Sequence, residues 1–518
     1  MLQIQPSFTS LLTVVLASFV LRRLFCRKSN ALPYPPGPPA LPLIGNLYDL
    51  ASSSSTDHSW VKLWKWSQVY GDIFHFEVFG QHTVVLNSQE TMDALLEKRS
   101  GNYSDRPDLP MFLGLMDANW DFALFRYSDW WRMHRRTFHQ RFQPRVMPEY
   151  HDVQREATLE LIENITQSPE EFFTHVAHHS GSMILKVLYG YTLKGKDDPY
   201  LKLVLNSLEG IIAAGVPGSF WVDYLPSLKY VPAWFPGASF QRKAKKWKQT
   251  NRELKEQPWE WVKEGVETGT AIPSFCTLTA ERLGITFGDG SDMEDVVKNC
   301  ATMAYAAGTD TTASAILSFI LAMTIHPDFQ LRAQKEIDSV LGAGVSGGRL
   351  PDLEDRDKLP FVNAIIQEVL RWNTVTPLSV AHRALQDDVY EGYFIPAGAT
   401  VVPNVWAVFR DENVYGPRTA EFDPDRFARL EKEGKTPPSP EEFAFGFGRR
   451  ICPGRYFAAN TIYIAVVYLL STFNIARQVD ESGKEIVPEP DYFDGLISHP
   501  KPFKCRFVPR NPGRVHIQ

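Results

Sequence analysis

The chain has 518 residues, of which 44% are hydrophobic and 22% charged, and its formal net charge is −6. This length and composition allow a large buried core. The acidic balance gives no reason to expect nucleic-acid binding, because no basic run is interleaved with stacking aromatic residues. The five cysteines are far apart and form no C-x-x-C pair, so neither a disulfide framework nor a structural zinc site is expected, and a reducing compartment fits best. They are Cys26, Cys276, Cys300, Cys452 and Cys505.

The first segment of the chain is apolar. Residues 1–21 carry no charge, and four basic residues follow at once, namely Arg22, Arg23, Arg27 and Lys28. A helix that continues to about Phe25 is roughly long enough to cross a membrane at 1.5 Å per residue. A cleaved signal peptide would have positive charge before the apolar run and a small-residue cleavage site after it, and neither is seen. Residues 1–28 are therefore predicted to be one transmembrane anchor with a basic flank, which places the rest of the chain in the cytosol.

A proline-rich stretch follows, in residues 29–46, with six prolines between Pro33 and Pro42. Prolines impose an extended and stiff conformation. The stretch could be a ligand for an SH3-type domain, but its position favours a hinge between the anchor and the globular body.

Beyond the hinge, the hydrophobic pattern predicts a small sheet and then a mainly helical body. Alternating segments at 75–79 and 82–86 predict strands. Helical periodicity dominates from about Asp129 onward, and short strands return at 393–395 and 503–508.

A long helix is predicted from Ser291 to about His326, because Ser291 and Glu294 can form a capping box and Pro327 stops the helix. Its middle, residues 307–312, reads Ala-Gly-Thr-Asp-Thr-Thr, and Gly and Thr are both poor interior helix residues. One interpretation is a packing notch whose threonine hydroxyls bond back to the preceding turn.

The other interpretation of this block is a helix that is locally opened to make a pocket for dioxygen. In that case Asp310 and Thr311 would relay protons to the distal oxygen as the O–O bond breaks. Further along the chain, Glu368 and Arg371 are three residues apart and share one helix face. Such a pair contributes little on a surface.

Cys452 lies in the sequence Phe-Gly-Phe-Gly-Arg-Arg-Ile-Cys-Pro-Gly, residues 445–454. A thiolate ligand of iron needs an accessible sulfur, electropositive neighbours and backbone that can pass close beneath a flat cofactor. Gly448 and Gly454 permit such a backbone, Arg450 supplies positive charge, and Phe445 can shield the sulfur. The N-terminus of the helix predicted to follow adds partial positive charge. Cys452 is therefore predicted to be an axial ligand of haem iron; the alternative is a small buried hydrophobic residue.

The pattern F-x-x-G-x-R-x-C-x-G resembles the haem-binding loop of the cytochrome P450 superfamily, and residues 307–312 resemble its oxygen-activation motif. Glu368 and Arg371, together with Arg426, resemble the E-x-x-R network of that family, with Asp425 where glutamate is usual. The resemblance runs from about residue 35 to the C-terminus. It implies one large, mainly α-helical domain with small β-sheets over residues 47–518, preceded by the single transmembrane helix.

The resemblance also implies a haem b cofactor, whose iron Cys452 would ligate so that cleavage of the O–O bond is favoured. Asp310 and Thr311 would be the catalytic pair. Haem propionates need arginine and indole donors. Trp131 and Arg135, which match W-x-x-x-R, would bind them together with Arg383 and Arg450.

The two electrons of the reaction must come from another protein, because only 66 residues follow Cys452, too few for a flavin domain. The implied partner is NADPH-cytochrome P450 reductase, with cytochrome b5 as an optional second donor. Its docking face is expected to include Arg132, Arg136, Arg449 and Arg455.

Four segments resemble the substrate-lining stretches of the family, and they are largely apolar, which predicts a lipophilic substrate. They are residues 105–122, 215–236, 375–381 and 493–497. The second is rich in aromatic residues and prolines, and it is expected either to contact the membrane interface or to be a buried loop.

The predicted function is that of a fungal microsomal haem-thiolate monooxygenase, single-pass in the endoplasmic reticulum membrane, in the style of basidiomycete members. It would act on terpenoid, polyketide or indole skeletons of secondary metabolism. One alternative is a monooxygenase of broad specificity for foreign aromatic compounds. Another is a haem-binding sensor or isomerase that needs no external electrons, against which the retention of Asp310 and Thr311 argues.

Overall fold

The computed structural model describes residues 32–51, 58–341 and 349–510. The α-helices are α2 (Leu47–Ala51), α3 (Ser59–Tyr70), α4 (Gln89–Met92), α5 (Asp129–Phe142), α6 (His151–Gln167), α7 (Phe172–Tyr189), α8 (Pro199–Ala214), α9 (Trp221–Tyr224), α10 (Ser239–Thr268), α11 (Phe275–Leu283), α12 (Asp292–Ile325), α13 (Pro327–Leu341), α14 (Pro360–Trp372), α15 (Val405–Phe409), α16 (Glu412–Tyr415), α17 (Asp425–Lys432), α18 (Glu441–Ala444) and α19 (Arg455–Thr472). Short π or 3-10 turns include η1 (Asp93–Glu97), η2 (Pro110–Leu115) and η7 (Gly448–Arg450).

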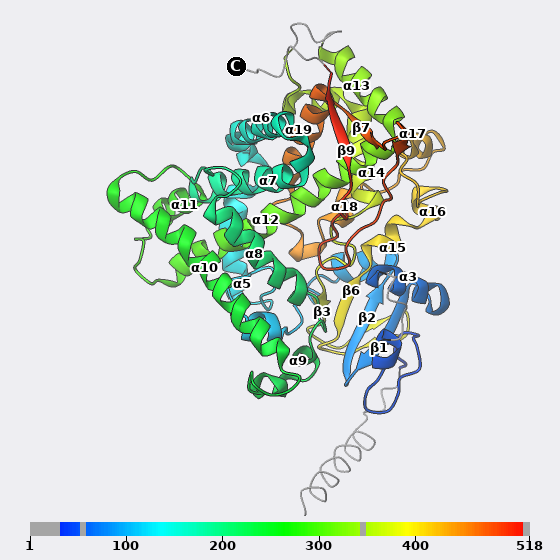
Figure 1. Ribbon diagram of the computed structural model, residues 1–518. Coiled ribbons are helices and arrows are strands. Elements are labelled where there is room, and N and C mark those ends of the chain that lie inside the picture. The colour runs from blue at the N-terminus through cyan, green and yellow to red at the C-terminus, as the bar shows by residue number, and fades with distance from the viewer. Residues whose placement is uncertain (1–31, 52–57, 342–348, 511–518) are drawn as a thin grey trace, which may run out of the picture.

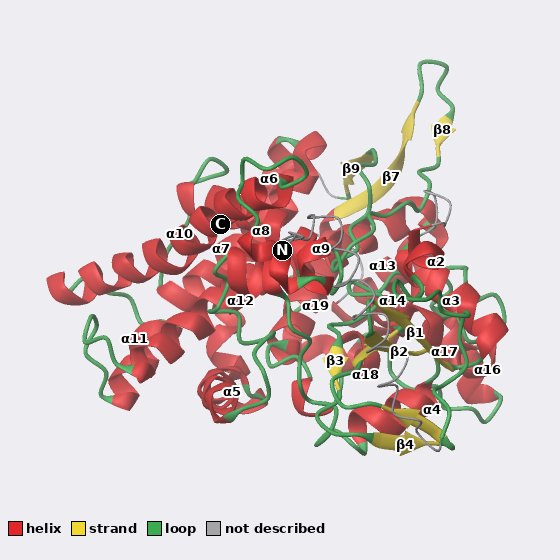
Figure 2. Cartoon of the chain, turned by 90° about the horizontal axis from the view of Figure 1, so that it is seen from below, coloured by secondary structure: helices red, strands yellow, loops and turns green. Residues whose placement is uncertain are grey.

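The strands form three small sheets. They are β1 (Ile73–Val78), β2 (Gln81–Leu86), β3 (His382–Arg383), β4 (Asp388–Tyr390), β5 (Tyr393–Ile395), β6 (Thr400–Pro403), β7 (Phe473–Val479), β8 (Glu485–Ile486) and β9 (Cys505–Pro509). The largest sheet has the order β1-β2-β6-β3, in which only the β2–β6 pair is parallel. Figure 2 shows how small the strand content is beside the helices. The fold is therefore mainly α-helical with small sheets, as predicted.

The part of the proline-rich segment that the structure describes packs on the body. The His75 N–H donates to the Pro36 carbonyl at 2.8 Å, and the Phe394 N–H donates to the Pro33 carbonyl at 2.7 Å. The Tyr34 ring stacks on His75 with their centroids 4.8 Å apart. A Cβ on Gly37 would lie 1.8 Å from the His75 carbonyl oxygen, so only glycine allows this approach. The segment is thus held against β1 and β5 as well as being extended.

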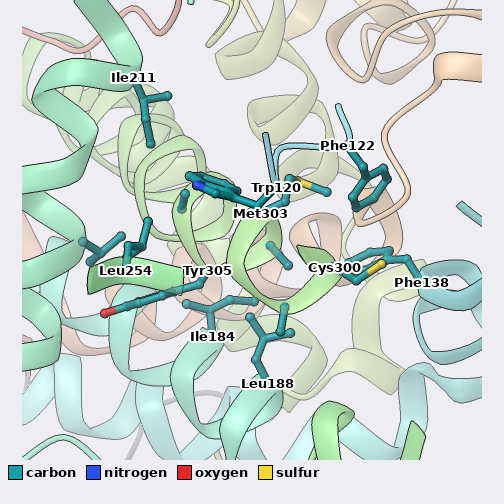
Figure 3. Close-up of a cluster of buried hydrophobic side chains, with 14 of the residues drawn as sticks. Trp120, Phe122, Phe138, Ile184, Leu188, Ile211, Leu254, Cys300, Met303 and Tyr305 are labelled. Atoms are coloured by element: carbon teal, nitrogen blue, oxygen red, sulfur yellow. The ribbon is translucent and has the colours of Figure 1, made fainter. Parts of the chain in front are cut away.

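Helix α12 passes through the centre of the molecule (Figure 1). It is the one helix in the described residues that is long and apolar enough to span a membrane, but 78% of its apolar window is buried inside the protein, as expected of a core helix. Figure 3 shows Cys300, Met303 and Tyr305 of α12 among side chains of α5, α7, α8 and α10. The predicted anchor, residues 1–28, lies outside the described residues.

The N-terminus of α12 differs from the predicted capping box. Ser291 accepts from the Glu294 N–H at 3.2 Å, as expected. The Glu294 carboxylate does not return the bond to Ser291; it accepts from the N–H groups of Gly288 and Gly290, at 2.6 and 2.7 Å. The Ser291 N–H donates instead to Asp289 at 2.8 Å. The glycine turn before the helix is closer to the carboxylate, so only half of the box forms.

Candidate active site

The loop that carries Cys452 is shaped by its backbone. The Cys452 N–H donates to the Phe445 carbonyl at 2.7 Å, which closes the loop on itself. Gly448 has φ +53°, and a Cβ there would lie 2.3 Å from the Leu96 carbonyl oxygen of η1. Gly454 has an ordinary φ of −92°, so its backbone conformation does not require glycine. Its missing Cβ would lie 4.0 Å from the Cys452 sulfur, so glycine keeps the space beside the thiol open.

Cys452 itself is half-buried, at the entry to α19. Burial raises the pKa of its thiol, although the Gly454 N–H and the nearby Arg135 and Arg455 act in the opposite direction. Burial therefore outweighs the positive surroundings that the sequence suggested, and the thiolate needs a further cation at the sulfur. A metal ion directly bound to the sulfur would supply that charge.

Trp131 and Arg450 pack together, as expected of two ligands of one group. The Arg450 guanidinium carbon lies 4.2 Å from the centroid of the buried Trp131 ring. Its Nε donates to the Ser104 carbonyl at 2.7 Å and its Nη2 to the Phe125 carbonyl at 2.6 Å. Its Nη1 is buried and has no hydrogen-bond partner among the described residues. Arg450 thus has a donor left for an anion.

The cations around this loop lack sufficient counter-charge. Burial lowers the pKa of Arg450 to about 8, with repulsion by Arg106 as the next cause. Burial also lowers the pKa of Arg135 to about 10, in spite of the attraction of the Cys452 thiolate. Buried guanidinium groups need anions. The two carboxylates of a haem would supply them, so the cysteine, the spare Arg450 donor and the cations together fit haem.

Arg383, another predicted propionate ligand, lies near two carboxylates. Its Nη1 lies 3.6 Å from an Asp105 carboxylate oxygen and 3.7 Å from one of Asp108. The same Asp105 oxygen is also 2.8 Å from Arg126. Arg383 therefore has acidic neighbours, but its buried Nη1 makes no hydrogen bond with any described residue and, like that of Arg450, is left as a donor for an anion.

The block at 307–312 forms a continuous stretch of α-helix, so the expected local opening of the helix is absent. The Thr309 hydroxyl donates to the Tyr305 carbonyl at 2.8 Å, and the Thr311 hydroxyl donates to the Ala307 carbonyl at 2.9 Å. A Cβ on Gly308 would come within 3.1 Å of Ile184, so this glycine is a packing notch. The backbone of residues 307–312 therefore confirms the interpretation of this block as a packing notch.

The same block nevertheless interrupts the buried central part of the helix with partly exposed side chains. Ala307 is exposed and Thr311 half-buried, one turn apart on one face. The neighbouring Asp310 turns its Oδ2 to within 3.0 Å of the Nε2 of His499. Sequence analysis missed His499, because nothing in its local pattern distinguishes it and its loop reaches α12 only through the fold.

A cavity of about 860 Å³ lies between the β1-β2-β6-β3 sheet and α9. Members of all four predicted substrate-lining segments line it, for example Pro107, Val216, Leu378 and Leu496. Arg383 also lines it, whereas Cys452, Asp310 and Thr311 do not. The cavity therefore lies on the sheet side of the molecule, apart from Cys452 and from the acid–threonine pair of α12.

The aromatic segment at 215–236 is a surface feature, which overturns the buried-loop alternative. The exposed fractions of Tyr230 and Trp234 are 78% and 79%, and those of Trp221 and Phe235 are 56% and 50%. Helix α9, which lies within this stretch, is found toward the same lower end of the molecule as β1 (Figure 1).

The family model of cytochrome P450 matches residues 35–507. This chain belongs to that family. A cytochrome P450 monooxygenase of Armillaria gallica is 41% identical over 502 residues, which cover 96% of each chain. Cytochrome P450 monooxygenase COX2 of Coprinopsis cinerea is 38% identical, with 96% and 93% covered. Tryptamine 4-monooxygenase of Psilocybe cyanescens is 39% identical, with 92% of this chain and 93% of the relative covered.

These matches confirm the predicted family and enzyme class. The protein is a cytochrome P450 monooxygenase, an oxidoreductase that incorporates oxygen, and its similar relatives are fungal enzymes. Membership in the family implies a thiolate-ligated haem iron.

Proposed function

We propose that this cytochrome P450 inserts one atom of dioxygen into a lipophilic substrate of fungal secondary metabolism, at the endoplasmic reticulum membrane. The observation that carries the proposal is the Cys452 loop, where a half-buried thiol lies near buried cations that lack sufficient counter-charge. Bound there, a haem would supply the oxygen-activating chemistry.

The residues around the loop have distinct parts in this proposal. Cys452 would hold the iron, and Trp131, Arg135 and Arg450 would hold the propionates. Arg383, which lies near Asp105 and Asp108, would be a further propionate ligand. On α12, Asp310 and Thr311 would supply protons.

The substrate class we propose is a terpenoid, polyketide or indole skeleton. The indole class is supported by the relative named tryptamine 4-monooxygenase, which covers nearly the whole chain. The four apolar segments that meet at the cavity support a lipophilic molecule of moderate size.

We propose that the exposed aromatic segment rests in the membrane interface beside the anchor formed by residues 1–28. Trp and Tyr favour this layer because one end of each ring is apolar and the other is polar. Tyr230 and Trp234 are exposed to an extent that a purely aqueous surface would not favour. Electrons would come from NADPH through a separate reductase, with cytochrome b5 as an optional second donor.

The test begins with the absorption spectrum of the dithionite-reduced, carbon-monoxide-bound protein, for wild type and for Cys452→Ser. The proposal expects a strongly red-shifted Soret band that the substitution abolishes. A band at the position of histidine-ligated haem, unchanged by the substitution, would contradict it. Turnover of indole, terpenoid and polyketide panels in ¹⁸O₂ with reductase then identifies the substrate class, and the label must appear in the product.

A further inference from the structure

His499 contacts the acidic residue of α12 from a loop far away in the sequence. Its Nε2 lies 3.0 Å from the Asp310 Oδ2. Both atoms are buried, and neither forms a hydrogen bond of good geometry with any described residue, so the pair is defined by its short distance. Among the residues that the structure describes, no lysine or arginine lies within ion-pair distance of Asp310. His499 is thus the group to which this carboxylate is directed.

The loop is fixed on α12 close to this contact. The Ser314 hydroxyl, one turn beyond Asp310, donates to the Ser498 carbonyl at 2.6 Å. The Ser498 N–H donates to the Val375 carbonyl at 2.8 Å, and the Phe493 N–H donates to the His499 carbonyl at 2.9 Å. The backbone on both sides of the imidazole is therefore held, and the contact does not depend on a freely moving surface side chain.

The direction of Asp310 matters because of its neighbour. The Thr311 hydroxyl donates to the Ala307 carbonyl at 2.9 Å and so does not hold the carboxylate. Side chains one residue apart on a helix point about 100° from each other. With no bond from Thr311, an unpaired Asp310 could adopt several rotamers, and a buried carboxylate without a donor is costly.

We propose that His499 is a positioning residue for Asp310. The close approach of its Nε2 to Oδ2 holds the carboxylate in the single orientation from which it can exchange protons on the Thr311 side of α12. The inference rests on the proposed proton-delivering role of Asp310. The His499 side chain is 20% exposed and that of Asp310 13%, so the pair lies at the boundary between solvent and the helix interior.

The first test needs no turnover. Thermal unfolding of the haem-loaded full chain is measured for His499→Phe, Asp310→Asn and the double variant. We expect each single variant to lower Tm by about 2 °C, and the double variant to lose no more than the larger single loss. Losses that simply add would mean that the two side chains do not interact, which would overturn the proposal.

The second test measures the fraction of NADPH electrons released as hydrogen peroxide during turnover. His499→Phe should raise this fraction about tenfold, since misplacement of a proton donor costs catalysis on this scale, while substrate affinity stays unchanged. His499→Gln presents an amide N–H near the place of Nε2 and should restore most of the coupling. His326→Phe, the same change just past the other end of α12, is the matched control and should remain coupled.

The outcomes separate this inference from the function it rests on. If Asp310→Asn itself leaves peroxide release unchanged, the proposed proton delivery by Asp310 fails. If Asp310→Asn uncouples the enzyme but His499→Phe does not, only the positioning role fails. The role also fails if His499→Gln is as uncoupled as His499→Phe, because a polar N–H near the place of Nε2 should suffice.

Discussion

Glu368 and Arg371 meet through two hydrogen bonds, of 2.7 and 2.8 Å, at a place where neither side chain touches solvent. Arg426 adds a third bond to the same carboxylate at 3.2 Å and is equally buried. The Arg371 guanidinium also donates to the carbonyls of Phe409 and Thr419, both at 2.8 Å. The network ties α14 to the segment that leads into the cysteine loop, so it stabilises the fold behind the haem site and takes no part in the chemistry.

Removing the negative charge from this network should strongly destabilise the folded protein. Glu368→Gln leaves two buried arginines without a charge partner, and removing one member of a buried pair costs about 3–5 kcal/mol. We expect little folded, haem-loaded protein, measured as the yield of haem per polypeptide and as Tm. Arg332→Met is the matched control: Arg332 holds Asp425 through two bonds of 2.6 and 2.8 Å, but on the surface. It should cost about 1 kcal/mol or less.

Gly448→Ala should disrupt the cysteine loop. Its φ of +53° disfavours any side chain, and the added Cβ would collide with the Leu96 carbonyl. Gly434→Ala separates the two effects, since Gly434 has φ +76° but open space around it. We expect the control to cost about 1 kcal/mol and to keep its haem, while Gly448→Ala loses the red-shifted carbon-monoxide band. If the two variants gave the same carbon-monoxide spectrum, the Leu96 carbonyl would have to move away from the added Cβ.

Asp223 should make stability depend on pH. Burial raises the pKa of this carboxyl to about 6, although the N–H groups of Met111, Phe220 and Gly218 favour its charged form. Since the unfolded value is about 3.9, the folded chain binds more protons between about pH 4 and 6, and its stability falls as pH rises through that window. The loss is about 1–3 kcal/mol above pH 6.

Asp223→Asn should remove that component, so that the Tm difference between variant and wild type changes from pH 4 to 6 and is constant above it. Asp494→Asn alters an exposed carboxyl of the same cavity and should follow the wild-type profile. If the Tm of Asp223→Asn changed with pH in parallel with that of the wild type, burial would not be raising the pKa of Asp223.

The reductase face is expected on α5 and beside the cysteine loop. Arg132, Arg136 and Arg449 are exposed, and Arg455 is half-buried against Tyr456. Reversing charge with Arg132→Glu and Arg136→Glu should lower reductase-supported turnover about tenfold, most strongly at low salt, and leave peroxide-driven turnover intact. Lys335→Glu, on an exposed position of α13, is the control. Equal loss of both activities would point to damage at the haem site.

The elements with strong local signals were predictable. The alternating residues of β1 and β2 and the proline-bounded α12 follow from period and breakers, which act within a few residues. The half-formed cap at Glu294 could not be predicted. Whether this carboxylate accepts from the Ser291 N–H or from the preceding glycine N–H groups depends on how the glycine turn folds.

The chemistry of this protein could be predicted from local motifs: the cysteine loop and the acid–threonine block each require particular residue types at fixed short spacing, and so does the Glu368–Arg371 pair that supports the fold. Tertiary structure decided which partners those residues meet. It gave Arg383 two carboxylates, kept α12 continuous at Gly308 and brought His499 to Asp310. Contacts between distant segments depend on packing of the whole chain, because burial and orientation are set by neighbours that no local pattern encodes.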